Sequence, residues 1–361
     1  MGLTCFPNGV SSFGIPIWGN GIGPLGPATG NVYYLLVSKD STDPYYTLLH
    51  NRGIPDASMF STLEAAQDAM TTNQGDTLIV MPGLHTETVT CNWAKNRCHI
   101  VGAGSPTSLL TGYSSSRSGG AATYNTTLYT DTAAVDYVLH ITGDNCEFYN
   151  LAIQNGLSGG SATSSNLAAA YVGGDSNYFR GVHFQGLNST AQAGAAACSS
   201  LNIGAGWGGH IFEDCVIGNN TFCIARTVAA QGQLLFSDAD VTPNPQHGMF
   251  RNCTFLSRGE TAAVVMVYST GQYGSDRTFI WDHCNFVNHS VNWAFACTYV
   301  FDWPVGAQTA QHLLRDCACS GYTYWYDGAP LGAAGSILMT ATPISGQGGG
   351  IARTATAAAG S

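Results

Sequence analysis

Two acidic residues, Glu213 and Asp282, are the side chains whose type and spacing could support the cleavage of a glycosidic bond. Such bonds are cut by paired carboxyl groups, one protonated and one ionised. The two residues occupy equivalent positions in a sequence repeat described below, two repeats apart. If the repeats stack as coils of a solenoid, their carboxyl groups lie roughly 9–10 Å apart, which is near or beyond the upper limit for an inverting pair. The column of equivalent positions is Tyr149, Arg180, Glu213, Arg251, Asp282 and Arg315. Because the arginines should lower both carboxyl pKa values, whereas a general acid needs a raised one, we expect a structural ladder of alternating charges.

Other groups that could do chemistry are scattered. Asp238 and Asp240 share a loop, but two carboxylates alone make a poor calcium site. His85, Glu87 and Glu260 are isolated, and hydrogen-bonded or solvated roles suit them. The sequence lacks the zinc-protease, nucleophile-elbow, phosphate-loop and dinucleotide motifs. We therefore expect no catalytic residue, no metal and no cofactor.

A repeat starting near residue 146 indicates the fold. Large apolar residues recur at intervals of 31 to 38 residues, at Phe148, Phe179, Phe212, Phe250, Trp281 and Leu314. Two residues after each comes a residue type that tolerates a positive φ: Asn150, Gly181, Asp214, Asn252, His283 and Asp316. Each repeat is therefore predicted to be a strand, a one-residue left-handed bend and a second strand. Identical corners at this spacing predict an all-β solenoid, a right-handed parallel β-helix with coils about 4.8 Å apart.

The solenoid has predicted boundaries. We expect the β-helix over residues 31–321, with a short N-terminal capping helix at about 61–73 that opens on the capping box Ser61-Thr-Leu-Glu64. Residues 1–30 are rich in Gly and Pro, and residues 322–361 are rich in Ala, Gly and Thr. Both terminal segments are predicted to be extended arms.

Twelve cysteines make the chain cysteine-rich, without a CxxC pair or a His/Cys cluster at zinc spacing. Four of them occupy one interior column of the repeat, which predicts a ladder of small apolar side chains: Cys215, Cys253, Cys284 and Cys317. Two alternatives stay open for the cysteines. They are buried thiols, or some form disulfides to neighbouring chains, for which Cys5 is the best candidate.

Composition excludes several classes. With 45% hydrophobic residues the chain is not a disordered acidic protein. A net charge of −10 without a Lys/Arg cluster argues against a nucleic-acid partner, and no apolar run is long enough for a membrane span. The N-terminus lacks a basic segment followed by an apolar one, so we expect no secretory export.

The stretch DTLIVMPGLHTETVTCNWAKNRCHIVGAG, residues 76–104, resembles the start of pectin-lyase-like β-helix proteins. The resemblance implies the same fold, which hosts lyases, hydrolases, adhesins and viral spikes. The polygalacturonase motifs NTD, DD, GHG and RIK are absent, as is the acidic calcium cluster with a catalytic arginine of pectate lyases. These departures lead us to expect a protein that is not an enzyme.

The segment FPNGVSSFGIPIWG, residues 6–19, is similar to the N-termini of structural proteins from tailed-bacteriophage heads. This resemblance implies a capsid decoration or minor capsid protein, a homotrimer assembled in the host cytoplasm and located on the virion surface. Its partners would be the major capsid protein and other virion proteins, contacted through Cys5, Phe6, Phe13, Ile15, Ile17 and Trp18. The alternatives are a tailspike-like polysaccharide depolymerase and a non-catalytic receptor-binding fibre.

Overall fold

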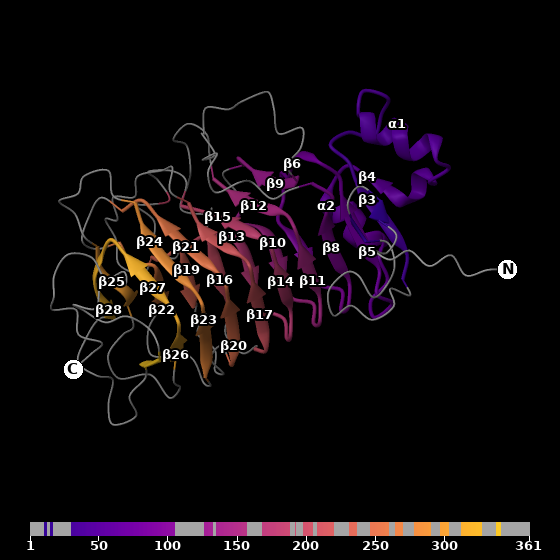
Figure 1. Cartoon of the computed structure of the whole chain (residues 1–361). Coiled ribbons are helices and arrows are strands. Elements are labelled where there is room, and N and C mark those ends of the chain that lie inside the picture. Colours follow the sequence, from indigo (N-terminus) through magenta and orange to yellow (C-terminus); the bar gives the residue numbers. More distant parts are fainter. Residues whose placement is uncertain are drawn as a thin grey trace.

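The fold was analysed in a computed structural model of the chain. It describes residues 11–12, 15–16, 30–104, 126–132, 135–156, 168–187, 192, 198–204, 208–219, 231–236, 246–259, 264–269, 278–289, 297–302, 312–326 and 337–340. The predicted fold is confirmed, because successive strands wind through three parallel sheets that run along one axis (Figure 1). We name them sheets I, II and III.

Sheet I starts at the N-terminal end of the solenoid and runs its whole length. Its strands in spatial order are β4 (Met59–Phe60), β3 (Val32–Leu35), β5 (Thr77–Val80), β8 (His99–Gly102), β11 (Glu147–Tyr149), β14 (Tyr178–Arg180), β17 (His210–Glu213), β20 (Gly248–Arg251), β23 (Phe279–Asp282), β26 (His312–Arg315) and β29 (Ile337–Thr340). Sheet II contains β6 (Gly83–Thr86), β9 (Thr126–Thr130), β12 (Ala152–Asn155), β15 (His183–Gln185), β18 (Val216–Gly218), β21 (Thr254–Ser257), β24 (Asn285–Asn288) and β27 (Ala318–Ser320).

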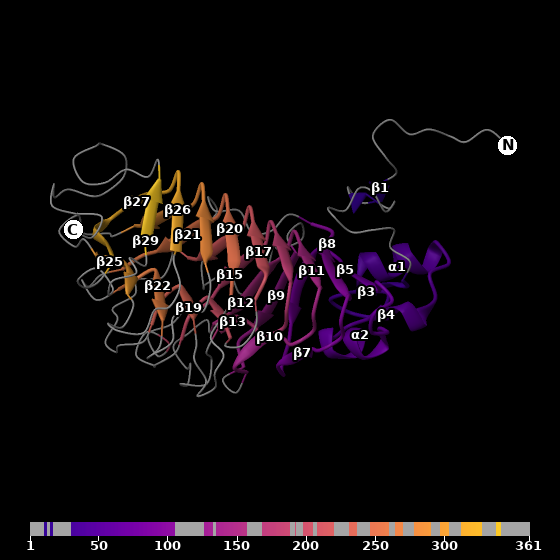
Figure 2. The same cartoon turned by 90° about the horizontal axis from the view of Figure 1, so that it is seen from below.

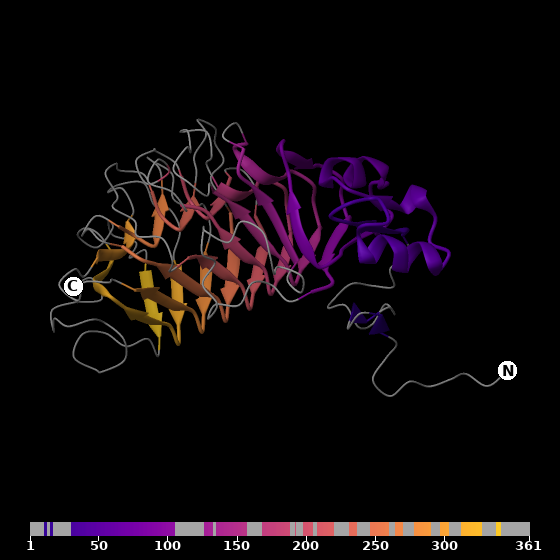
Figure 3. The same cartoon turned by 90° about the horizontal axis from the view of Figure 1, so that it is seen from above.

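Sheet III completes each coil. It contains β7 (Cys91–Trp93), β10 (Tyr137–Ile141), β13 (Ala168–Val172), β16 (Leu201–Ile203), β19 (Leu234–Phe236), β22 (Val267–Ser269), β25 (Cys297–Asp302) and β28 (Tyr322–Tyr326). Figures 2 and 3 show these layers from below and from above. A separate antiparallel pair, β1 (Ser11–Ser12) and β2 (Ile15–Pro16), lies near the N-terminus.

The corner between sheets I and II has the predicted backbone. All six predicted corner residues, from Asn150 to Asp316, have a positive φ between 51° and 63°. The amide of each corner residue also donates a hydrogen bond to the strand-end carbonyl of the next coil, as from His283 to Arg315 at 2.9 Å. One left-handed residue per coil therefore turns the chain and keeps the coils in register.

Interior aromatic rings stack along the axis, because the corners hold equivalent residues one coil apart. From Phe148 to Trp281, rings on consecutive coils have centroids 4.6 to 4.8 Å apart and planes within 10° of parallel. All of these rings are fully buried. Such offset aromatic pairs add to the free energy of burial.

Ten cysteines fall in the described part of the chain, and all are buried thiols. The column of Cys215, Cys253, Cys284 and Cys317 lies inside the solenoid, where each sulfur contacts a carbonyl oxygen of the preceding coil at 3.3 to 3.5 Å. Burial raises the pKa of the Cys253 thiol well above its ordinary value. Since the thiolate is the reactive form, the interior position suits packing.

The N-terminal end is covered by helices. Helix α2 (Leu63–Ala69) is shorter than predicted and begins after Thr62, whose side chain accepts from the amide of Ala65. Sequence analysis missed α1 (Pro44–Asn51), which begins after Asp43, and the short 3-10 helix η1 (Asp56–Ser58). No helix in the described ranges is long and apolar enough to cross a membrane.

The predicted end of the solenoid at residue 321 is wrong. Strands β28 and β29 pair in parallel with β25 and β26 and so extend sheets III and I. Tyr322 and Trp325, which we assigned to an extended arm, fill the core instead. Tyr322 and Trp325 are therefore core residues of a strand of the solenoid.

The predicted N-terminal arm is described only at β1, β2 and Gly30. The backbone of Ile15 belongs to β2. Cys5, Phe6, Phe13, Ile17 and Trp18, to which we assigned partner contacts, lie outside the described residues.

The corner geometry predicts opposite effects of two substitutions at Asn252, whose φ is 52°. Asn252→Gly should leave the free energy of unfolding nearly unchanged, because glycine adopts this conformation readily. Asn252→Val should lower it by about 1–2 kcal/mol, the cost of a left-handed residue with a bulky side chain. Urea unfolding followed by circular dichroism measures both, with Thr254→Val in the adjacent strand as the control. Equal stability of the Val variant and the natural chain would contradict the assignment.

Candidate functional site

The alternating charges form one row at the end of the sheet I strands. The strand register aligns Arg180 with Glu213, Arg251, Asp282 and Arg315 in consecutive coils. Two direct ion pairs form along this row, Glu213 with Arg251 at 3.0 Å and Asp282 with Arg315 at 2.7 Å. Arg180 instead contacts the corner residue Asp214 at 3.3 Å.

Glu213 and Asp282 are both poor general acids. The hydrogen bond from Arg315 lowers the pKa of Asp282 to about 2. The hydroxyl of Tyr178 donates to Glu213 and, together with Arg251, lowers its pKa as well. Because neither carboxyl group holds a proton at neutral pH, the pair does not provide the protonated acid that glycoside cleavage needs.

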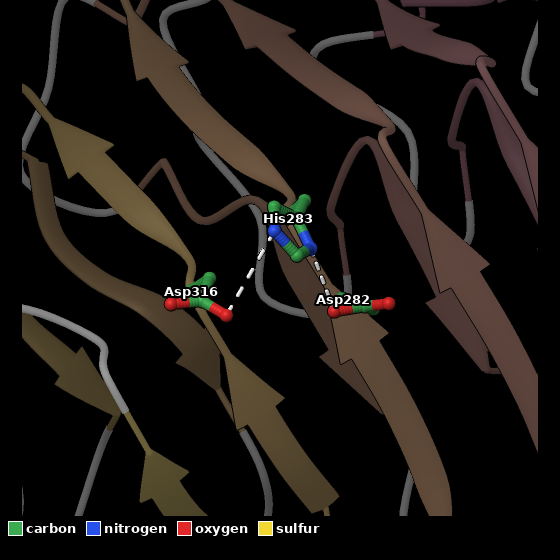
Figure 4. Close-up of side chains that lie close together, drawn as sticks. All are labelled: Asp282, His283 and Asp316. Carbon is green, nitrogen blue, oxygen red and sulfur yellow. Dashed lines mark hydrogen bonds and ion pairs between the residues drawn. The ribbon is translucent and has the colours of Figure 1, made fainter.

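A different cluster, which sequence analysis missed, contains Asp282, His283 and Asp316 (Figure 4). His283 Nδ1 lies 2.8 Å from Asp282 Oδ1, and His283 Nε2 lies 3.8 Å from Asp316 Oδ2. The Asp282 side chain is only 8% exposed, whereas those of His283 and Asp316 are 58% and 42% exposed. The imidazole therefore sits between two carboxylates on an accessible edge of the solenoid.

The fold explains how these residues meet. Asp282 ends β23, His283 is the left-handed corner that follows it, and Asp316 is the same corner one coil later. The sequence held the signal, since His283 and Asp316 are consecutive members of the corner column. We interpreted that column only through the backbone conformations its residue types tolerate.

Arg315 holds Asp282 in place. Its Nε and Nη2 atoms donate to the two carboxylate oxygens at 2.8 and 2.7 Å. Two parallel bonds of this kind fix both position and charge. With Asp282 ionised, its Oδ1 accepts from His283 Nδ1, and His283 Nε2 is directed toward Asp316 (Figure 4). The cluster also offers three ligand atoms within 4.8 Å of one another, but the guanidinium already occupies both Asp282 oxygens and opposes a cation.

The other candidates from sequence have structural roles or fall outside the description. Buried His85 contacts the carbonyl of Met81 through Nε2 at 2.7 Å. Glu87 accepts from the first amide of α2, at Leu63, and its burial raises its carboxyl pKa. Three further acidic candidates lie outside the described ranges: Asp238, Asp240 and Glu260.

Comparison with solved structures confirms the fold. A pectin methylesterase from Aspergillus niger, in its deglycosylated form, superposes with a TM-score of 0.50 at 14% identity, over 88% of this chain and 85% of that one. A pectate lyase gives 0.40 at 14% identity, over 88% and 79%. A protein of Geobacillus virus E2 gives 0.39 at 11% identity, over 77% and 56%. No family model and no curated protein matches the sequence.

These findings correct the expectation that the chain is not an enzyme. The Aspergillus niger neighbour is itself an enzyme, so missing polygalacturonase and pectate lyase motifs did not exclude catalysis on this fold. The resemblance to phage head proteins gains no support from the comparisons. A virion location, trimer formation and binding to capsid protein remain predictions from residues 6–19.

The ion pair predicts a specific pH dependence. Asp282 has a pKa of about 2 when folded and about 3.9 when unfolded, so its contribution to stability is complete above about pH 5 and is lost as the pH falls through about 2. Arg315→Gln should raise the Asp282 pKa toward its ordinary value and flatten this loss. Carboxyl ¹³C NMR and unfolding between pH 2 and 6 measure the two effects. Arg180→Gln is the control, and an Asp282 pKa that stays near 2 without Arg315 would contradict the assignment.

Proposed function

We propose that the chain is a polysaccharide-acting hydrolase that removes ester groups from a glycan lying across the outer face of sheet I. One observation carries the proposal: the 2.8 Å contact between buried, ionised Asp282 and exposed His283. A carboxylate bonded to one imidazole nitrogen leaves the other as a general base. His283 is the proposed catalytic residue, and Asp282 is a positioning residue.

The proposed reaction is ester hydrolysis by water. His283 Nε2 accepts a proton from a water molecule while the water oxygen attacks the ester carbonyl carbon. Nε and Nη2 of Arg315 donate to Asp282. Nη1 of the same guanidinium donates to the developing oxyanion. The carbon–oxygen bond to the alcohol then breaks, and the imidazolium returns its proton to the leaving oxygen. The products are a carboxylic acid and an alcohol.

Ester hydrolysis fits this site better than glycosidic cleavage. One imidazole can serve as base and then as acid in ester hydrolysis, whereas glycosidic cleavage needs a second, protonated carboxyl group. Arg315 lowers the pKa of Asp282, and Tyr178 and Arg251 lower that of Glu213. The fold adds support, since the Aspergillus niger structure with a TM-score of 0.50 is named a pectin methylesterase. A polysaccharide depolymerase, which would cut the glycan chain itself, is the second candidate among polysaccharide-acting enzymes.

The test compares variants at His283. His283→Asn places at this corner the residue type that the preceding coil carries at Asn252, so the fold should be kept. Turnover should fall at least about 10²-fold, the usual contribution of a general base. Methanol release from methyl-esterified pectin and acetate release from acetylated xylan measure it, and reducing-end release detects chain cleavage.

Asp214→Asn provides a matched control in the same corner column and should keep full activity. Asp282→Asn should also lose turnover, although His283 is retained, because it removes the ionised partner of His283 Nδ1. Unchanged turnover in His283→Asn, or no ester release from either polymer by the natural chain, would contradict the proposed function.

A further inference from the structure

Sheet III lies on the side of the solenoid away from β17, β20 and β26 (Figure 2). Three of its aromatic side chains form a cluster. Tyr137 and His140 belong to β10, and Tyr171 is the register partner of His140 on β13. The three ring centroids lie 4.9 to 5.7 Å apart. Each side chain is half-buried. His140 and Tyr171 alternate with residues that face the core, namely Leu139, Ile141, Ala170 and Val172. Tyr137 is the first residue of β10, and its ring contacts the other two rings from the start of that strand. We call these three residues the ring platform.

Amide groups border the ring platform. Asn92 Oδ1 lies 3.0 Å from His140 Nδ1 on one side. On the other side Asn202 is the register partner of Tyr171, and its side-chain oxygen is buried without a hydrogen-bond partner among the described residues. Asn202 is only 3% exposed, and a buried acceptor of this kind costs free energy until a donor reaches it.

The ring platform suits sugars. A pyranose has an apolar face of C–H groups that packs on an aromatic ring, and an edge of hydroxyl groups that bond to amides and to tyrosine hydroxyls. The cluster and its two bordering amides contain no Lys, Arg, Asp or Glu. Burial lowers the pKa of His140, which keeps the imidazole neutral, and Asp136 next to Tyr137 would repel an anion. The chemistry therefore selects uncharged sugar rings.

We propose that Tyr137, His140 and Tyr171 form a binding site for neutral sugar units of a polysaccharide, on a different sheet from the Asp282–His283–Asp316 cluster. This site goes beyond the proposed function and does not depend on it. Tyr171 stacks on the sugar ring, and Asn202 accepts from a sugar hydroxyl once the ligand reaches it. A polymer held there stays attached to the protein whether or not an ester is in reach of sheet I.

Calorimetric titration with cellohexaose, maltohexaose, mannohexaose and hexagalacturonate tests the site in the full chain. At least one neutral hexasaccharide should bind, and loss of the Tyr171 ring should weaken that binding more than it weakens any binding of hexagalacturonate. Tyr171→Ala should weaken binding of the neutral hexasaccharide about 10-fold or more, whereas Tyr171→Phe keeps the ring and should change it less than about 3-fold. Tyr171→Leu provides a second variant without a ring if the Ala variant does not fold.

Two controls separate this site from other effects. Tyr46 on α1 is also half-buried and lies beside a histidine, His50, with ring centroids 5.8 Å apart. The Tyr46→Ala variant should therefore bind the neutral hexasaccharide as the natural chain does. His283→Asn should also bind the neutral hexasaccharide normally while it loses ester hydrolysis. The binding proposal and the catalytic proposal can therefore be contradicted separately. The proposal is overturned if no neutral hexasaccharide binds, if loss of the Tyr171 ring weakens hexagalacturonate as much as the neutral sugars, or if neither loss of the Tyr171 ring changes affinity.

Discussion

A single left-handed residue per coil controls this structure. At each corner between sheets I and II it turns the chain, and its amide donates to the strand end of the next coil. A register slip of one residue would send the stacked rings of Phe212 and Phe250 to the surface and the charged row into the core. The same corners place His283 and Asp316 one coil apart on the outside.

The repetitive part of this architecture could be predicted from sequence because it depends on periodicity and on residue types with distinctive backbone preferences. The corner residues, the interior columns and the parallel sheets follow from these two signals. The predictions failed where periodicity gives no information. Sequence analysis missed α1, and we assigned β28 to an arm because its aromatic residues lacked the repeat pattern.

The candidate site was harder to predict than the fold. Asp282 and Arg315 belong to a row whose alternating charges indicated a ladder, while His283 belongs to a column selected for backbone conformation. Only the side-chain directions at the corner reveal that the two columns meet. The expectation of a non-enzymatic protein failed for a related reason: it rested on motifs of other enzymes, whereas an acid–base group needs only a few side chains at one place.

The central claim is that the corner of β23 holds the reacting ester. A crystal structure of the His283→Asn variant with methyl-esterified hexagalacturonate tests it most directly. The account predicts a sugar chain across the outer face of sheet I, with an ester carbonyl carbon within one water molecule of position 283 and its oxygen facing Arg315. A glycan bound with every ester away from Asp282 and Asp316 would contradict the account.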